Sequence, residues 1–301
     1  MKSKQKKTNL IIIIRILAVM IFIIMPVWTI MIYHANFGRR FETPEEMAYS
    51  VNDFEGLKVT ECSFPSNHGQ IIAGYQYSKE EQSINGVVVL AHGLGEGHNP
   101  YMNTVNFFAS NGYLVFAYDA TGNDKSEGNS IEGLPQGIID LDYALRYVKQ
   151  TDTYKGLPIV LFGHSWGGYS VGNVLNCHPD VKAAVIVAGF DRSIDLIESQ
   201  GKTVLGSSIK LFIPYISLYE RLKFGEYASY SAMDGFANSE ADIMVIHSRD
   251  DTVVPIEYGY DKFYDVYGDN ARFCFVEYQD KGHNFDHDLM ERIIEYLQDE
   301  N

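Results

Sequence analysis

The chain has 301 residues and a formal net charge of −15, and 46% of its residues are hydrophobic, which suits one folded domain behind a separate N-terminal segment. The acidic balance argues against nucleic acid or strongly anionic ligands as partners. The three cysteines, Cys62, Cys177 and Cys274, show neither a disulfide framework nor metal-binding spacing, so we expect free buried thiols.

The first predicted element is an apolar helix behind a basic N-terminus. Residues 16–32 contain no charge and are long enough to cross the core of a bilayer. Five basic residues lie before this stretch, whereas only Arg39 and Arg40 follow it closely, so the positive-inside rule places the N-terminus in the cytoplasm and the rest outside. We expect a single-pass cell-membrane anchor in residues 1–35 and a polar stalk in residues 36–55. A cleaved signal peptide and a secreted protein stay open as the alternative.

From residue 56 onward, short apolar runs alternate with helical patterns. Strands are predicted at 58–63, 70–77, 86–91, 113–118, 158–163, 183–189, 243–247 and 272–278. Helices are predicted at 100–111, 135–151, 166–177, 257–268 and 285–298. This alternation predicts one α/β domain over residues 56–301, with a mostly parallel eight-stranded sheet, helices on both faces and an antiparallel edge formed by the first two strands.

The segment between the sixth and seventh predicted strands is too long for a plain connection. It has helical stretches of its own, at 194–199, 207–219 and 227–236. Its apolar side chains include Leu211, Phe212, Ile213, Tyr215, Ile216 and Leu218. We expect residues 191–240 to form a helical cap. Its apolar residues either pack the cap onto the core or form the wall of a pocket for an acyl chain.

The most informative motif is Gly163-His164-Ser165-Trp166-Gly167, which reads G-x-S-x-G. A strand-like run precedes it, and residues that can start a helix follow it. Such a strand-to-helix turn holds a serine hydroxyl above the sheet, and glycines on both sides permit the tight backbone. The context predicts that Ser165 is a nucleophile.

A serine nucleophile needs a histidine as base and a carboxylate that holds the histidine in the correct tautomer. His283 follows the last predicted strand, where an open α/β sheet places its site, and His287 in the next helix is the alternative. The pair has no apparent third metal ligand, so no metal is expected. Asp250 and Asp251 both follow the seventh strand. We favour Asp251, because the apolar turn after it would anchor its side chain.

A tetrahedral oxyanion needs two backbone N–H donors. One is expected from Trp166, at the start of the helix after the serine, where the helix dipole favours negative charge. The second is expected from the glycine-rich loop after the third strand, where Leu94 is favoured and Gly93 is the neighbouring alternative. Three other histidines are expected to brace local structure: His92, His98 and His164.

Together these motifs resemble the α/β-hydrolase superfamily, and within it the branch of the monoacylglycerol lipases and serine aminopeptidase-like hydrolases. The resemblance covers residues 56–298, and the order Ser165, Asp251, His283 is the order of that superfamily. It implies a structural role for Asp119. It rests on His92-Gly93-Leu94-Gly95-Glu96, Asp119-Ala120-Thr121-Gly122, the serine motif with Gly168, Asp251-Thr252-Val253-Val254-Pro255 and Gly282-His283.

The predicted function is a membrane-anchored serine hydrolase that cleaves carboxylic esters, lipid-like esters included, without a cofactor. The resemblance also permits a serine aminopeptidase, in which cap carboxylates would bind the substrate ammonium group. The candidates for that role are Glu198, Glu220 and Glu226. A third possibility is a non-catalytic hydrolase fold used as a binding module, which would have no need of the serine, acid, histidine and glycine loop together.

Overall fold

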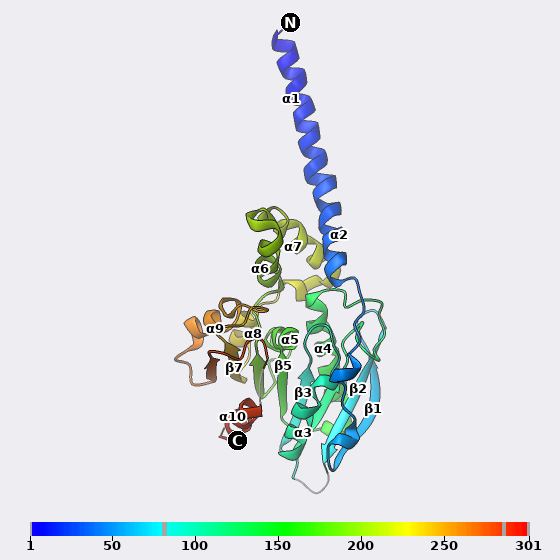
Figure 1. The fold of residues 1–301 in the computed structure, drawn as a ribbon, viewed down its shortest axis with the longest axis vertical. Coiled ribbons are helices and arrows are strands. Elements are labelled where there is room, and N and C mark those ends of the chain that lie inside the picture. The colour runs from blue at the N-terminus through cyan, green and yellow to red at the C-terminus, as the bar shows by residue number, and fades with distance from the viewer. Residues whose placement is uncertain (1, 80–82, 285–286, 300–301) are drawn as a thin grey trace.

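The computed structural model describes residues 2–79, 83–284 and 287–299, and its main body is an eight-stranded sheet between helices (Figure 1). The strands are β1 (Leu57–Pro65), β2 (Ile71–Lys79), β3 (Gly86–Ala91), β4 (Tyr113–Tyr118), β5 (Ile159–His164), β6 (Ala183–Val187), β7 (Asp242–Ser248) and β8 (Phe273–Tyr278). Their order in the sheet is β1-β2-β4-β3-β5-β6-β7-β8. β2 pairs antiparallel with β1 and β4, and all other pairs are parallel. The predicted strands and the antiparallel edge are confirmed.

Helices cover both faces of the sheet, and each face has its own apolar core. One core joins the sheet to four helices: α4 (Leu134–Gln150), α5 (Trp166–Val174), α8 (Ala232–Asn238) and α9 (Tyr260–Tyr267). The opposite core joins it to α3 (Met102–Ser110) and α10 (His287–Asp299). Every residue of β3 and β4 is buried, because these central strands are covered on both sides. The fold class predicted from the alternation of strands and helices is confirmed.

The segment between β6 and β7 contains α6 (Ser193–Leu205), the 3₁₀ turns η6 (Gly206–Leu211) and η7 (Gly225–Ser229), and between them α7 (Ile213–Phe224). Two predicted boundaries here are wrong. The helix expected from residue 207 begins as α7 only at Ile213, because Pro214 lacks an N–H donor and fits the first turn of a helix. The helix expected from residue 227 is broken at Tyr230, which is extended, and α8 starts afresh after its cap Ser231.

The N-terminal helix projects away from the main body (Figure 1). It consists of α1 (Lys2–Val19), a π-helical turn (Met20–Ile24) and α2 (Met25–Phe37). The π turn precedes Pro26, whose missing N–H interrupts the regular ladder. By length and composition, Gln5–Phe37 can cross a membrane, with a mean hydropathy of 3.0 in its most apolar window. The helix is thus a candidate membrane span or signal segment.

The chain after this helix lies against the main body. The Phe41 N–H donates to Gly122 O at 3.0 Å, and the Asp124 N–H donates to Phe41 O at 3.1 Å. These hydrogen bonds fix the point at which the chain joins the loop that follows β4. The remaining short 3₁₀ turns are Glu45–Met47, Val51–Asp53, Asn99–Tyr101, Asp152–Tyr154 and Ile256–Tyr258.

A buried carboxyl group attaches the end of α2 to the helices between β6 and β7. The Tyr33 O–H donates to Glu220 Oε1 at 2.9 Å, and the Ser193 O–H donates to Glu220 Oε2 at 2.8 Å. Burial raises the pKa of the Glu220 carboxyl to about 7, although the hydrogen bonds from Ser193 and Tyr33 act in the opposite direction. The Glu220 carboxyl therefore retains its proton to a higher pH in the folded chain than in the unfolded chain.

This raised pKa predicts a pH dependence of stability. The stabilisation that comes from protonated Glu220 is fully present below the unfolded-state pKa and is lost as the pH rises toward about 7. Glu220→Gln cannot ionise, so its melting temperature relative to the unmodified chain should rise between pH 5 and pH 7.5. Glu226→Gln, at an exposed position in η7, is the control and should not show this rise. The same pH trend in both variants would contradict the interpretation.

Candidate active site

Ser165 occupies the turn between β5 and α5. Its φ of 56° lies in the left-handed region that side chains rarely adopt. The Ser165 N–H donates to Val187 O on β6 at 2.8 Å, and Ser165 O accepts the Tyr169 N–H at 2.9 Å. These bonds hold the residue in its strained conformation, which is typical of functional turns.

The glycines on both sides of Ser165 are required by close packing. A Cβ on Gly163 would overlap the carbonyl oxygen of Gly167, and a Cβ on Gly167 would overlap the carbonyl oxygen of Ala91 in β3. Neither glycine has a positive φ. The tight turn therefore needs glycine for its lack of a side chain rather than for its freedom of backbone rotation.

The structure brings together the three residues that the sequence singled out for proton transfer. His283 Nε2 lies 2.8 Å from Ser165 Oγ, and His283 Nδ1 lies 2.8 Å from Asp251 Oδ2. The three side chains come from the loops after β5, β7 and β8, whose carboxyl ends lie at one edge of the sheet. His287 begins α10, and its side chain lies outside the part of the chain that the structure describes.

The two neighbouring aspartates have different surroundings. Asp251 is buried, and its Oδ1 accepts the N–H groups of Val253 and Val254 at 2.8 and 3.0 Å. Burial alone would raise its pKa, but hydrogen bonds from His247, His283 and the Val254 N–H outweigh that effect and hold the pKa well below its usual range. Asp251 is therefore a carboxylate at neutral pH.

Asp250 is exposed, and its side chain forms hydrogen bonds that hold the loop around His283. Its Oδ1 accepts the Ser248 O–H at 2.7 Å and the Gly282 N–H at 2.9 Å. Both bonds lower the pKa of Asp250. The side chain thus fixes the backbone next to His283, whereas the ring of His283 contacts Asp251.

The structure separates the two candidates for the second oxyanion donor. The Gly93 N–H donates to the Tyr101 hydroxyl at 2.9 Å, so it is already used. Among the described hydrogen bonds, none uses the N–H of Leu94 or of Trp166. Both residues line the same cavity as Ser165. Leu94 and Trp166 are therefore better placed than Gly93 to donate to a bound substrate.

Two of the remaining histidines brace loops near the site, as expected. His92 Nδ1 lies 2.7 Å from the carbonyl oxygen of Gly93, and His92 Nε2 accepts a hydrogen bond from the Ala120 N–H. His98 lies 2.7 Å from Asp119 Oδ1 and 2.8 Å from the Tyr77 hydroxyl. Both rings are buried, and their partners lie in the loops after β3 and β4 and, for His98, also on β2 at Tyr77.

His164 also braces a nearby loop, as expected, but through a partner that the sequence did not predict. Its Nε2 donates to the backbone carbonyl of His283 at 2.8 Å, and its Nδ1 lies 2.9 Å from the Tyr101 hydroxyl oxygen, which itself lies 2.9 Å from Glu96 Oε1. Burial lowers the pKa of His164 to about 4, so the ring is neutral at pH 7. This chain of contacts holds the loop that carries His283. The only signal in the sequence was the position of His164 beside the serine.

A cavity of about 830 Å³ lies above Ser165. This volume is in the upper part of the range for small-molecule sites. Its apolar lining comes partly from the helices between β6 and β7, including Leu196, Ile197, Ile209, Phe212 and Ile216. Of the apolar cap residues named from the sequence, Phe212 and Ile216 line the cavity, whereas Leu211 and Leu218 are exposed.

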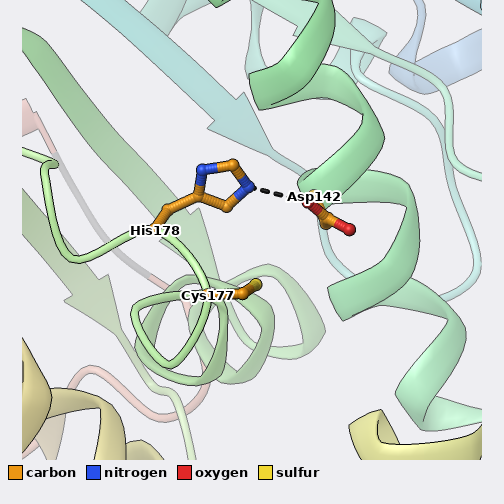
Figure 2. Close-up of side chains that lie close together, drawn as sticks. All are labelled: Asp142, Cys177 and His178. Carbon is orange, nitrogen blue, oxygen red and sulfur yellow. Dashed lines mark hydrogen bonds and ion pairs between the residues drawn. The ribbon is translucent and has the colours of Figure 1, made fainter.

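A second cluster has side chains of the types that bind metal ions, but its surroundings do not suit a metal ion. It consists of Asp142, Cys177 and His178 (Figure 2). Asp142 accepts hydrogen bonds from His178 at 2.7 Å, from the Arg146 guanidinium at 2.6 and 2.8 Å and from the Tyr227 hydroxyl at 2.6 Å. Burial raises the pKa of the Cys177 thiol to about 12. A protonated thiol and an adjacent guanidinium do not suit a divalent cation. The cluster instead joins α4 to η7 and to the loop after α5.

Comparison with known proteins identifies the family. A sequence profile described as serine aminopeptidase S33 matches residues 82–233, about half of the chain. The chain belongs to the serine aminopeptidase S33 family. The matched segment of this S33 chain contains the loop with Leu94 and the turn with Ser165. The resemblance predicted from the motifs is confirmed.

Curated relatives of the S33 chain include esterases and lipases. It is 30% identical over 128 residues to caffeoylshikimate esterase of Arabidopsis thaliana, an alignment that covers 42% of this chain and 37% of that protein. It is 29% identical over 93 residues to human monoglyceride lipase, with 31% of each chain covered. The S33 chain thus spans less than half the length of these relatives.

Solved structures extend the likeness to nearly the whole S33 chain. An esterase of Pyrococcus furiosus superposes with a TM-score of 0.65 at 16% identity, over 87% of this chain and 97% of that one. Acetyl xylan esterase 1 from Thermoanaerobacterium sp. JW/SL YS485 superposes with a TM-score of 0.61 at 15% identity, over 82% and 84%. These likenesses show the α/β-hydrolase fold.

Proposed function

We propose that this chain is a serine hydrolase that cleaves carboxylic esters through an acyl-enzyme on Ser165. The observation that carries the proposal is the pair of 2.8 Å contacts joining Ser165 Oγ to His283 and His283 to Asp251. A nucleophile, a base and an orienting carboxylate at hydrogen-bond distance are what acyl transfer requires. Membership of the S33 family supports a hydrolase.

Each residue has one role in the proposed reaction. Ser165 Oγ forms a bond to the ester carbonyl carbon while its proton passes to His283 Nε2. Asp251 accepts the Nδ1–H of His283 and stabilises the imidazolium. When the C–O bond to the leaving alcohol breaks, His283 returns the proton to that oxygen. Water then attacks the acyl-enzyme, with His283 again as base, and releases the acid and free Ser165.

The oxyanion formed in both steps is assigned to the N–H groups of Leu94 and Trp166. Both residues line the cavity with Ser165, and Trp166 is the first residue of α5, where the helix dipole favours a negative charge. Donors fixed before the reaction stabilise the developing charge without reorganising.

The cavity lining favours an ester with an apolar acyl group over a peptide with a free N-terminus. None of the described residues that line the cavity is Asp or Glu. Three carboxyl groups were considered as partners for an ammonium group. Glu220 already accepts hydrogen bonds from Tyr33 and Ser193. Glu198 forms an ion pair with Lys202 at 3.4 Å, and Glu226 is exposed in η7. An ammonium group in the cavity would therefore lack a counter-ion among these residues.

A substrate panel tests the proposal. Full-length protein in detergent is assayed with p-nitrophenyl esters from acetate to palmitate and with aminoacyl p-nitroanilides. We expect ester hydrolysis whose kcat/KM rises with chain length, since each buried methylene contributes about 0.8 kcal/mol. Faster cleavage of the anilides would make the chain an aminopeptidase. Turnover of neither class would support a binding module.

The same proposal includes the N-terminal segment and the division of the chain. We assign residues 1–35 to a membrane anchor with a cytoplasmic N-terminus, residues 36–55 to a connecting stalk, and residues 56–301 to the hydrolase domain, with residues 191–240 as its cap. The 33-residue apolar helix supports the anchor. Resistance of the full-length protein to alkaline carbonate extraction checks it. A mature N-terminus near residue 36 would instead establish a cleaved signal peptide.

A further inference from the structure

The apolar N-terminal helix forms part of the wall of the cavity above Ser165. Five residues of α2 line the cavity together with Ser165 and His283: Thr29, Ile32, Tyr33, Asn36 and Phe37. In Figure 1, α2 reaches the main body beside α7, so this wall faces the helices between β6 and β7. A segment that only anchored the protein would have no need to reach the reacting serine's cavity.

The contact between α2 and α7 is buried and specific. Tyr33 is only 3% exposed, and its O–H donates to Glu220. Its ring packs against Phe37 and Tyr219, with ring centroids 4.7 and 5.0 Å apart. Tyr33 also shares an apolar cluster with Ile216, which lines the same cavity. The end of α2 therefore has one fixed position relative to the cavity.

The lining contributed by α2 is suited to an amphiphile. Ile32 and Phe37 present apolar surface, whereas the Thr29 hydroxyl is buried without a hydrogen-bond partner among the described residues. A buried hydroxyl that lines a cavity without a partner is available to a polar group of a bound molecule.

The helices between β6 and β7, of which α7 contacts α2, also expose apolar side chains. Exposed aliphatic residues between residues 204 and 222 are Val204, Leu205, Leu211, Leu218 and Leu222. The outer surface of α2 is also apolar, at Val27, Trp28 and Met31. Exposed apolar surfaces of this kind are more stable in contact with lipid acyl chains than in contact with water. They place the cavity beside the bilayer surface if the helix spans the membrane.

We propose that the five cavity-lining residues of α2 are part of the substrate-binding site, and that the substrate is a membrane-resident ester with a long acyl chain lying along this helix. The inference rests on the proposed ester hydrolysis at Ser165. It assigns the helix a role in specificity as well as in anchoring. Removal of the helix would open one wall of the cavity.

Two isoleucines of α2 provide a matched test. Ile32 lines the cavity, whereas Ile30 does not, and the two side chains are almost equally exposed, at 38% and 39%. Full-length Ile32→Trp and Ile30→Trp are compared in phosphatidylcholine nanodiscs with p-nitrophenyl acetate and p-nitrophenyl dodecanoate. Ile32→Trp should lower kcat/KM for the dodecanoate about tenfold and leave the acetate within about twofold, because the larger ring fills the acyl channel. Ile30→Trp should change neither.

A cavity-widening variant gives a result of opposite sign. Ile32→Ala should raise the ratio of palmitate to dodecanoate turnover, and Ile30→Ala should leave this ratio unchanged. If the Ile32 variants behave like the Ile30 variants while the unmodified chain hydrolyses both esters, the inference is wrong and the proposed function stands.

Failure of the proposed function has a different signature. If the unmodified chain hydrolyses no ester, binding of dansyl-undecanoic acid to the same nanodisc-embedded variants decides the inference. An affinity about tenfold weaker for Ile32→Trp than for Ile30→Trp would support α2 as part of a binding site for acyl chains. Equal affinities would overturn it.

Discussion

Ser165→Ala is expected to abolish ester hydrolysis. Loss of the attacking oxygen removes the acyl-enzyme path, so kcat should fall by about 10⁴- to 10⁶-fold, to the level that the oxyanion donors and substrate binding alone support. The fold should survive, because Ser165 is held by backbone bonds to Val187 and Tyr169 that alanine retains. Steady-state kinetics together with the melting temperature measure both parts of the expectation.

Ser170→Ala is the control for this substitution. Ser170 lies one turn along α5, and its O–H donates to Trp166 O at 2.8 Å. Loss of this hydroxyl should leave turnover within about threefold, because the contacts of Ser165 and His283 are unchanged. If Ser165→Ala retained more than a tenth of the activity, Ser165 would not be the nucleophile.

Asp251→Asn is expected to lower kcat by about 10⁴-fold with little change in KM. The amide NH₂ cannot accept the Nδ1–H of His283, so the imidazole loses the tautomer that takes the serine proton. The negative charge that stabilises the imidazolium is lost as well. The substitution also weakens the 3.2 Å pairing of Asp251 with buried His247, so the melting temperature is measured in parallel.

Asp250→Asn is the matched substitution at the neighbouring position. The Asp250 side chain accepts hydrogen bonds from the Ser248 O–H and the Gly282 N–H, and the amide oxygen of asparagine can accept the same two hydrogen bonds. Turnover should therefore stay within about threefold of the unmodified chain. Equal losses in the two asparagine variants would show that the carboxylate at position 251 does not orient His283.

The central strands could be predicted because each is a short apolar run in a chain of ordinary polarity. β3 and β4 are buried along their whole length, so burial leaves a continuous signal in the sequence. The helices between β6 and β7 were predicted less well, because their boundaries depend on local chemistry such as Pro214 in the first turn of α7. Within that region, hydrophobicity alone does not mark where one helix ends.

The proximity of Ser165, Asp251 and His283 could be predicted, because for each of them both the residue type and its place after a strand are diagnostic. Contacts that depend on a partner distant in the sequence could not be predicted. The Gly93 N–H already donates a hydrogen bond to the Tyr101 hydroxyl, and this bond distinguishes Gly93 from Leu94 as a candidate oxyanion donor. The bond between Tyr33 and Glu220 joins residues 187 positions apart. No local pattern reports contacts of this kind.

Labelling with an alkyl fluorophosphonate tests the assignment of the nucleophile most directly. An activated serine forms an O–P bond with this probe and expels fluoride, and the stable adduct is mapped by mass spectrometry of peptides. The geometry around His283 predicts a single adduct on Ser165 in the full-length chain, with none in Ser165→Ala. An adduct on another residue, or an unlabelled Ser165 in folded protein that hydrolyses esters, would contradict it.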